Sequence, residues 1–145
     1  NMTTSRSLVA VIGAAGNTGR PLLGALARRG TPARAILRNS SRSPSVPDAR
    51  EVAVADLANV EDLTRALGGA AVVHFIPPLF KPEEEQYAAN VVRAAVAAGT
   101  RRVVYHSVLH ANTPRMPHHV RKARIETMIR ESPLAWTILQ PAMYT

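Results

Sequence analysis

The chain has 145 residues, a formal net charge of +8 and no cysteine. An apolar fraction of 46% excludes a disordered chain, and the lack of cysteine excludes disulfides, thiolate metal sites and a cysteine nucleophile. The apolar runs are shorter than a membrane span, and residues 8–12 are too few for a signal peptide. We expect one cytoplasmic domain with no membrane partner.

The positive charge raises the question of a nucleic-acid partner. The basic residues are scattered along the chain with no run of five or six, and aromatic residues for base stacking make up 4%. A small ligand that carries phosphate explains a basic surface better. We therefore expect no nucleic acid.

Apolar runs of strand length alternate with helical spacing along the whole chain. Residues 38–48 carry four serines and two prolines and are expected to be a loop, as are residues 108–117. Asn59 is placed to cap a helix with Glu61 and Asp62 in its first turn. Pro82 opens the third helix, and Gly99 closes it. The predicted strands are 8–13, 33–37, 51–55, 70–76, 102–107 and 134–139, and the other predicted helices are 21–29, 60–67 and 118–130.

This alternation predicts the fold. Strands without polar interruption that alternate with helices, with only the loop 38–48 in place of a helix after the second strand, are typical of a parallel sheet that is covered on both faces. Right-handed crossovers then favour a doubly wound α/β sheet, the Rossmann fold, with about six strands in the order 3-2-1-4-5-6. Residues 1–145 are expected to form one such domain.

A glycine loop, Gly13-Ala14-Ala15-Gly16-Asn17-Thr18-Gly19, joins the first strand to the first helix. Gly13 permits the tight turn, Gly16 lets a pyrophosphate approach the backbone, and Gly19 lets the helix pack closely on the strand. Asn17 and Thr18 lie at the helix start, where free N–H groups and the helix dipole bind anions. The alternative is a tight turn that binds no ligand.

Arg38 follows the second strand, where NAD-specific sites place an acidic residue for the ribose 2′-hydroxyl. No acidic residue occurs between positions 20 and 47. Arg38 is suited to a forked, charge-assisted contact with a 2′-phosphate, and Arg34 and Arg42 are expected to add to the positive field. The hypothesis is therefore NADP(H) as cofactor, with NAD less favoured. The alternative is a solvated surface arginine.

Other strand ends supply further cofactor candidates. Asp56 and Leu57 follow the third strand, where a carboxylate can accept from the adenine amine, although a turn or capping aspartate fits equally well. Ile76 and Pro77 end the fourth strand and can border the cofactor, although a proline there also serves to stop a strand.

Taken together, these residues resemble the NmrA-like branch of the atypical short-chain dehydrogenase/reductases. The resemblance also rests on the strand end Tyr105-His106-Ser107 and on the run from Trp136 to Tyr144. It implies an NADP-binding Rossmann fold. The family includes NADPH-dependent reductases of quinones, dyes and similar electrophiles, and regulators that bind the dinucleotide without turnover. Its members continue into a small substrate-binding part, so this chain is expected to be the N-terminal part of a longer protein.

The resemblance also implies site residues. The superfamily's Tyr-x-x-x-Lys pair corresponds to His118 and Lys122, so the lysine that holds the ribose is kept and the proton-donating tyrosine is replaced. Ser107 takes the place of a substrate-orienting serine, although a capping or turn serine fits equally well, and Pro141 lies where the backbone meets the nicotinamide amide. Helical spacing puts His118 and Lys122 on one stripe with Ile125 and Ile129, and puts Glu126 and Arg130 on another face.

No metal site is expected, because His74, His106 and His110 do not have metal-ligand spacing. Two interpretations of function stay open. The retained lysine favours an NADPH-dependent reductase that acts on a small molecule. The missing tyrosine favours an NADP-binding regulator that acts through a protein partner. An exposed sheet edge would allow a homo-oligomer.

Overall fold

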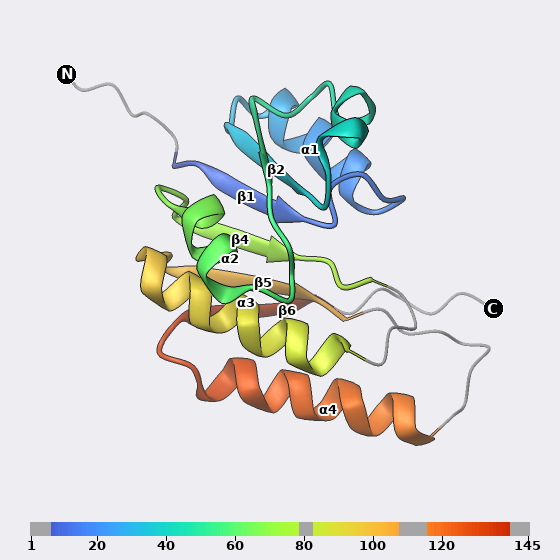
Figure 1. The fold of residues 1–145 in the computed structure, drawn as a ribbon, viewed down its shortest axis with the longest axis vertical. Coiled ribbons are helices and arrows are strands. Elements are labelled where there is room, and N and C mark those ends of the chain that lie inside the picture. The colour runs from blue at the N-terminus through green and yellow to red at the C-terminus, as the bar shows by residue number, and fades with distance from the viewer. Residues whose placement is uncertain (1–6, 79–82, 108–115, 140–145) are drawn as a thin grey trace.

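The computed structural model describes residues 7–78, 83–107 and 116–139, and of residues 116–122 it describes the backbone. Strands and helices alternate along the chain (Figure 1). The elements are β1 (Val9–Ile12), α1 (Gly19–Arg28), β2 (Ala33–Leu37), the 3-10 helix η1 (Ser40–Ser45), β3 (Glu51–Val54), α2 (Val60–Leu67), β4 (Val72–Phe75), α3 (Glu84–Ala98), β5 (Arg102–His106), α4 (Met116–Glu131) and β6 (Ala135–Leu139).

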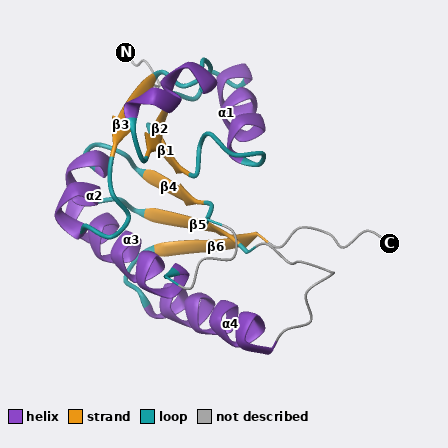
Figure 2. Cartoon of the chain, turned by 45° about the vertical axis from the view of Figure 1, so that its right-hand side comes forward, coloured by secondary structure: helices purple, strands orange, loops and turns teal. Residues whose placement is uncertain are grey.

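All six strands are parallel and lie in the order β3-β2-β1-β4-β5-β6, which confirms the predicted topology. Helices α2, α3 and α4 cover one face of this sheet, and α1 with η1 lies on the other (Figure 2). The order reverses between β1 and β4. In open parallel sheets, ligands bind at the carboxyl ends of the strands beside such a switch point.

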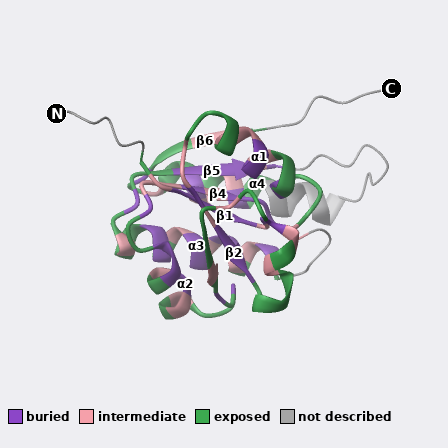
Figure 3. Ribbon diagram, turned by 90° about the horizontal axis from the view of Figure 1, so that it is seen from above, coloured by how far each residue is buried: buried purple, intermediate pink, exposed green. Residues whose placement is uncertain are grey.

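Alternation along β1 divides the core in two. Ala10 and Ile12 join the larger buried cluster, which includes residues of α2, α3 and α4, while Val9 and Val11 join a smaller cluster with Leu23 of α1. Figure 3 shows the buried residues concentrated on the central strands. The central strands are therefore covered on both sides, as their unbroken apolar sequences require, whereas the edge strands β3 and β6 are largely exposed.

The predicted bounds of β2 and α2 are confirmed, and the other predicted bounds differ by one or two residues, with α4 beginning at Met116 inside the predicted loop 108–117. Two of the differences have a clear reason. Residues 38–48 include the helix η1, because the Asn39 side chain accepts from the Ser41 N–H at 3.1 Å and starts a turn. Helix α1 begins at Gly19 instead of residue 21, since Pro21 fits within a first helical turn, where its missing N–H has no partner to lose. The predicted cap is confirmed, with Asn59 accepting from the Asp62 N–H at 3.0 Å.

Arg34 ties three elements together at the amino end of β2. Its Nε lies 2.8 Å from Glu51 Oε1 on β3, and its Nη1 donates to the carbonyl oxygens of Ala66 and Gly68, both at 2.7 Å. These carbonyls belong to the end of α2, where no helical N–H is left to pair with them. The guanidinium is mostly buried, so it acts as a structural cap for α2.

We predict that Arg34→Ala lowers the free energy of unfolding by about 1–3 kcal/mol, because two helix-end carbonyls and the Glu51 carboxylate lose a charged donor. Urea unfolding measures the change. Arg50→Ala, which removes an exposed arginine beside β3, serves as the matched control and should change stability by less than about 0.5 kcal/mol. Equal losses in the two variants would contradict the capping role.

Candidate functional site

The turn from β1 into α1 is built on two glycines. Gly13 has φ +86°, and a Cβ there would lie 2.5 Å from the carbonyl oxygen of Ile76. A Cβ on Gly19 would overlap the Gly13 carbonyl and Ala14. At Gly16, by contrast, a Cβ would lie 3.5 Å from the Gly13 carbonyl oxygen, which is ordinary van der Waals contact, so nothing in the protein itself demands glycine there. A requirement at Gly16 would have to come from a ligand.

The amino end of α1 is open to an anion. Thr18 is the N-cap residue, its side chain makes no capping hydrogen bond, and the first turn holds no acidic residue. The first N–H groups of a helix have no partner within the helix and carry its positive dipole end. The Arg20 N–H donates to the Gly16 carbonyl oxygen at 3.1 Å, and Pro21 has no N–H, so the N–H groups at Thr18 and Gly19 are the ones left for an anion. Since neither a side-chain cap nor a carboxylate occupies this end, it has the arrangement of a phosphate site.

A pocket of about 450 Å³ lies in front of this helix end. It is formed by the glycine loop and by the carboxyl ends of β1, β2, β3 and β4, as the switch-point rule expects. Among the residues that the structure describes, none that lines the pocket is acidic. The lining residues are Ile12, Gly13, Ala14, Ala15, Gly16, Asn17, Thr18, Ile36, Leu37, Arg38, Asn39, Arg42, Ala55, Leu57, Ile76, Pro77 and Pro78.

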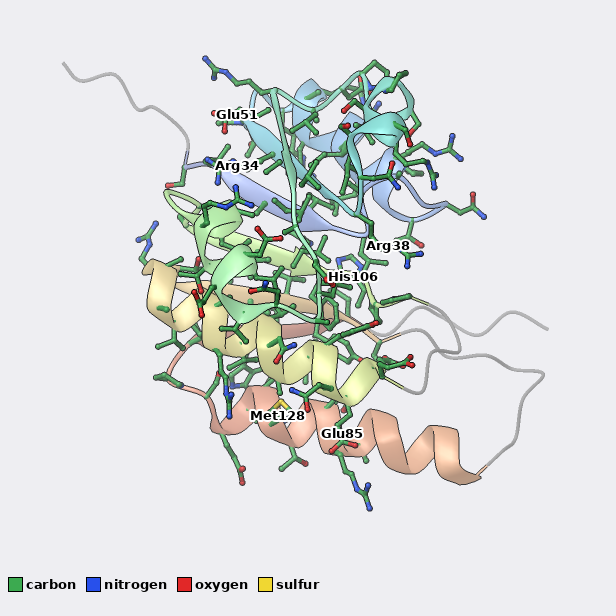
Figure 4. All side chains as sticks on the ribbon, in the orientation of Figure 1. Arg34, Arg38, Glu51, Glu85, His106 and Met128 are labelled. Carbon is green, nitrogen blue, oxygen red and sulfur yellow. The ribbon has the colours of Figure 1, made fainter. Side chains whose placement is uncertain are left out.

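Two arginines, Arg38 just before η1 and Arg42 within it, line this pocket. Arg38 follows β2 directly and is exposed, and Arg42 on η1 points its Nη2 toward the Ala15 carbonyl oxygen at 3.4 Å. The expectation for Arg34 is wrong, because that side chain is held by Glu51 and α2 at the opposite end of β2 from Arg38 (Figure 4). Asn39 also lines the pocket, and the sequence analysis missed it although it follows Arg38 directly.

Asp56 and Leu57, which are adjacent in sequence, take different roles in the structure. Leu57 lines the pocket, whereas Asp56 is not among the lining residues. The Asp56 Oδ1 accepts from the Ala58 N–H at 2.9 Å, and its own N–H donates to Asp62 at 2.9 Å. The side chain thus forms a turn that leads into α2, which was the alternative interpretation. Its contact with adenine stays a prediction.

The structure describes the predicted residues beyond β4 only in part. Pro141 lies outside the described residues, and His118 and Lys122 are placed on the backbone of α4 alone. Ser107 is buried, and its hydroxyl donates to Glu126 Oε2 at 3.2 Å. Glu126 was expected on a different face from the apolar stripe, yet it is partly buried against the sheet. Glu126 follows Lys122 by four residues, and this spacing puts both on one helix face, which the sequence could have indicated.

Tyr105 does not take the place of the missing tyrosine. It is fully buried on β5, and its hydroxyl donates to Glu84 Oε2 of α3 at 2.9 Å. Burial, together with the negative charge of Glu84, raises the pKa of Tyr105 above its ordinary value. A phenol that is enclosed in this way and holds its proton this strongly is suited to joining α3 to the sheet, and not to donating a proton to substrate.

His74 of β4 and His106 of β5 form a pair near the carboxyl edge of the sheet. His74 Nδ1 and His106 Nε2 are 2.9 Å apart, so one ring donates an N–H to the other. Burial, with the charge of His106 in support, lowers the pKa of His74 to about 4, and burial lowers the pKa of His106 as well. Within the described ranges no group of three or more acidic or histidine side chains is arranged to hold a metal ion.

We predict that this pair makes the protein less stable in mild acid. His74 has a lower pKa folded than unfolded, so the unfolded chain binds the extra proton and stability falls as the pH drops from about 6.5 toward 4. Between about pH 7.5 and about pH 5 the loss attributable to His74 should be about 1–2 kcal/mol, given its partial burial. Urea unfolding at the two pH values measures this loss of stability. His74→Val should lose less stability between them than the wild type, because it lacks the His74 imidazole. An unchanged pH dependence in His74→Val would contradict the assignment.

Comparison with known proteins places this site in a family. A model of the NAD(P)H-binding family matches residues 13–145. Among curated relatives, a 3-diazoavenalumate denitrifying reductase from a Streptomyces species is 35% identical over 75% of the chain, and quinone oxidoreductase 2 of Escherichia coli is 29% identical over 95% of it. The chain spans 40% and 49% of the lengths of these two proteins.

Solved structures agree. The NADPH complex of the Escherichia coli NADPH-dependent quinone oxidoreductase superposes with a TM-score of 0.80 at 27% identity, over 94% of this chain and 49% of that one. The NADP(H) complex of Citrobacter triphenylmethane reductase gives a TM-score of 0.77 at 29% identity, over 94% and 50%. With the glycine loop, the open helix end and the pocket at the switch point, these matches show that the chain belongs to the NAD(P)H-binding family.

Proposed function

We propose that the chain is the cofactor-binding part of an NADPH-dependent reductase that transfers hydride to a small electrophile such as a quinone. The observation that carries the proposal is the pocket in front of α1, which joins an uncapped helix end to two arginines and has no carboxylate among its described lining residues. The similarity to a quinone oxidoreductase and to a triphenylmethane reductase, both solved with NADP(H) or NADPH, supports the same chemistry.

The lining residues fit a dinucleotide that carries an extra phosphate. The helix start at Thr18 and Gly19 would receive the pyrophosphate, and Arg38, with Arg42 beside it, would receive a 2′-phosphate. An apolar wall for the adenine is provided by Ile12, Ile36 and Leu57. An NAD-specific site would instead need an acidic residue near Arg38 for the free 2′-hydroxyl, and the described part of the lining has none.

The reacting end belongs to α4 and to the strand ends of β4, β5 and β6. When bound, NADPH supplies a hydride from C4 of its nicotinamide. In this proposal Lys122 holds the nicotinamide ribose, His118 stands in place of the usual tyrosine as the proton donor, and Pro141 borders the nicotinamide amide. Ser107 has its hydroxyl on Glu126, so in this proposal it serves the site through α4.

Substrate recognition would need residues beyond those in the pocket. The chain spans about half the length of the curated relatives it matches, and the described pocket is accounted for by the dinucleotide. We therefore propose that the substrate-binding part lies elsewhere in a longer protein. In the described ranges, no helix is both long and apolar enough to span a lipid bilayer.

The proposed reaction is tested with the complete gene product that carries this chain. NADPH oxidation, followed by its absorbance, should depend on an added quinone from a panel of small quinones. If NADPH binds but no quinone or dye is reduced, the protein is an NADP-binding regulator and the reductase proposal fails. Unchanged NADPH affinity in Lys122→Ala would remove Lys122 from the ribose contact.

Cofactor preference gives a second prediction, which concerns Arg38. Arg38→Ala should weaken NADPH binding about tenfold or more, because a charge-assisted pair with the 2′-phosphate is lost, and should leave NADH binding within about twofold. Titration calorimetry with both cofactors measures this. Arg29→Ala, which removes an exposed arginine just after the far end of α1, is the control. If the wild type binds NADH more tightly than NADPH, the assignment of Arg38 is wrong.

A further inference from the structure

A polar contact joins the end of β5 to α4. Ser107 is 1% exposed, and its Oγ donates to Glu126 Oε2 at 3.2 Å. The Ser107 N–H donates to the Leu139 carbonyl oxygen of β6 at 2.9 Å, so the serine backbone is fixed to the sheet. Because its backbone is fixed to the sheet, the Ser107 hydroxyl is a hydrogen-bond donor at a fixed position, and Glu126 of α4 accepts its hydrogen bond.

Glu126 is held from its other side as well. Its Oε1 lies 3.4 Å from Arg130 Nη2 one turn later, and the Arg130 guanidinium lies 5.5 Å from the ring centre of Trp136 on β6. The Glu126 side chain is 14% exposed, while that of Arg130 is 49% exposed. Arg130 thus covers the carboxylate from the solvent side, and the directional contact with the sheet is the one to Ser107.

Apolar packing alone would not define the position of α4 along the sheet. Ile125 and Ile129 are fully buried beneath the helix, but apolar contact is non-directional and tolerates small shifts. A hydrogen bond weakens steeply when its distance or angle changes. The Ser107–Glu126 contact therefore adds a directional constraint on how far α4 reaches along the sheet and on how it is rotated.

The constraint on α4 bears on its first turns, which carry Lys122. The helix runs back along the sheet from the carboxyl edge, and its first turns project beyond the strand ends (Figure 1). Residue 122 precedes Glu126 by four positions, so it lies about 6 Å farther toward that edge and on the same face of the helix. Among the described residues, the contact of Glu126 with the end of β5 is a partly buried polar contact that ties this part of α4 to the sheet. On the exposed side, Arg124, two residues after Lys122, pairs with Glu85 of α3 at 3.7 Å.

We propose that Glu126 is a positioning residue, which uses its contact with Ser107 to hold the start of α4 where Lys122 reaches the nicotinamide half of the cofactor. The inference rests on the proposed function and adds to it a role for Glu126. Glu126 and Ser107 act through the helix and make no contact of their own with the cofactor.

The test separates the two halves of the cofactor. NADPH spans both halves, whereas adenosine 2′,5′-bisphosphate carries the adenosine and its 2′-phosphate and lacks the nicotinamide riboside. We expect Ser107→Ala and Glu126→Ala to raise the Kd for NADPH by about three- to tenfold and to leave the Kd for the bisphosphate within about twofold. Glu126→Gln keeps an acceptor for the Ser107 hydroxyl, so it should raise the Kd for NADPH by less than Glu126→Ala does. Glu131→Gln, which neutralises an exposed acid at the end of the same helix, should change neither constant.

A double-mutant cycle shows whether Glu126 acts through Lys122. If it does, adding Glu126→Ala to Lys122→Ala should weaken NADPH binding no further, because the group being positioned is already gone. Additive losses, or equal losses for NADPH and the bisphosphate, would mean that Glu126 supports only the general fold and would overturn the inference. So would unchanged NADPH affinity in Ser107→Ala and Glu126→Ala.

Amide hydrogen exchange tests the anchor without a cofactor. Ser107→Ala should speed exchange in residues 116–125 by about threefold or more relative to α2, because the first turns of α4 lose their attachment. Unchanged exchange would overturn the positioning role even if NADPH binds. A wild-type protein that binds neither NADPH nor the bisphosphate, with exchange changed as expected, would instead reject the proposed function.

Discussion

Gly19, the first residue of α1, packs against the carbonyl oxygen of Gly13 and against Ala14, and the rest of the site depends on this close approach. A side chain at position 19 would push the helix away from the end of β1. Because the helix starts so close to the strand, its unpaired N–H groups face the carboxyl edge of the sheet at the point where the strand order reverses. The anion site is therefore a result of backbone packing, and side chains only add selectivity to it.

The two sides of the sheet use different means to hold their helices. On the α1 side, small residues and a compact apolar cluster bring helix and strand together. On the other side, two hydroxyl-bearing residues at the carboxyl end of β5 each meet a glutamate from a different helix. Tyr105 holds Glu84 of α3, and Ser107 holds Glu126 of α4. Directional contacts of this kind are what a site needs when its reacting groups lie on helices that project past the sheet.

The basic residues near β2 have different roles in the structure. Arg38 and Arg42 face the pocket, whereas Arg34 caps a helix at the other end of β2, only four residues from Arg38 in sequence. Sequence spacing could not separate these roles. A strand carries residues 34 and 38 to opposite edges of the sheet, and only the edge with the carboxyl ends meets the ligand.

The sequence by itself determined the glycine turn and the start of α2 at Asn59, because these follow from local rules of backbone freedom and capping. It also determined the strand order, because the alternation of strands and helices leaves few topologies once crossovers are right-handed. The tertiary structure decided what periodicity does not encode. It showed the Asp56 side chain in a turn, the Asn39 cap that makes η1, the pairing of His74 with His106, and the contact of Glu126 with Ser107. The contacts of Asp56 and Asn39 are local, but the sequence leaves the turn at Asp56 as one of two alternatives, and the Asn39 cap was not predicted. The His74–His106 and Ser107–Glu126 contacts join residues far apart in sequence, and a hydrogen bond needs both partners at a set distance before it can form.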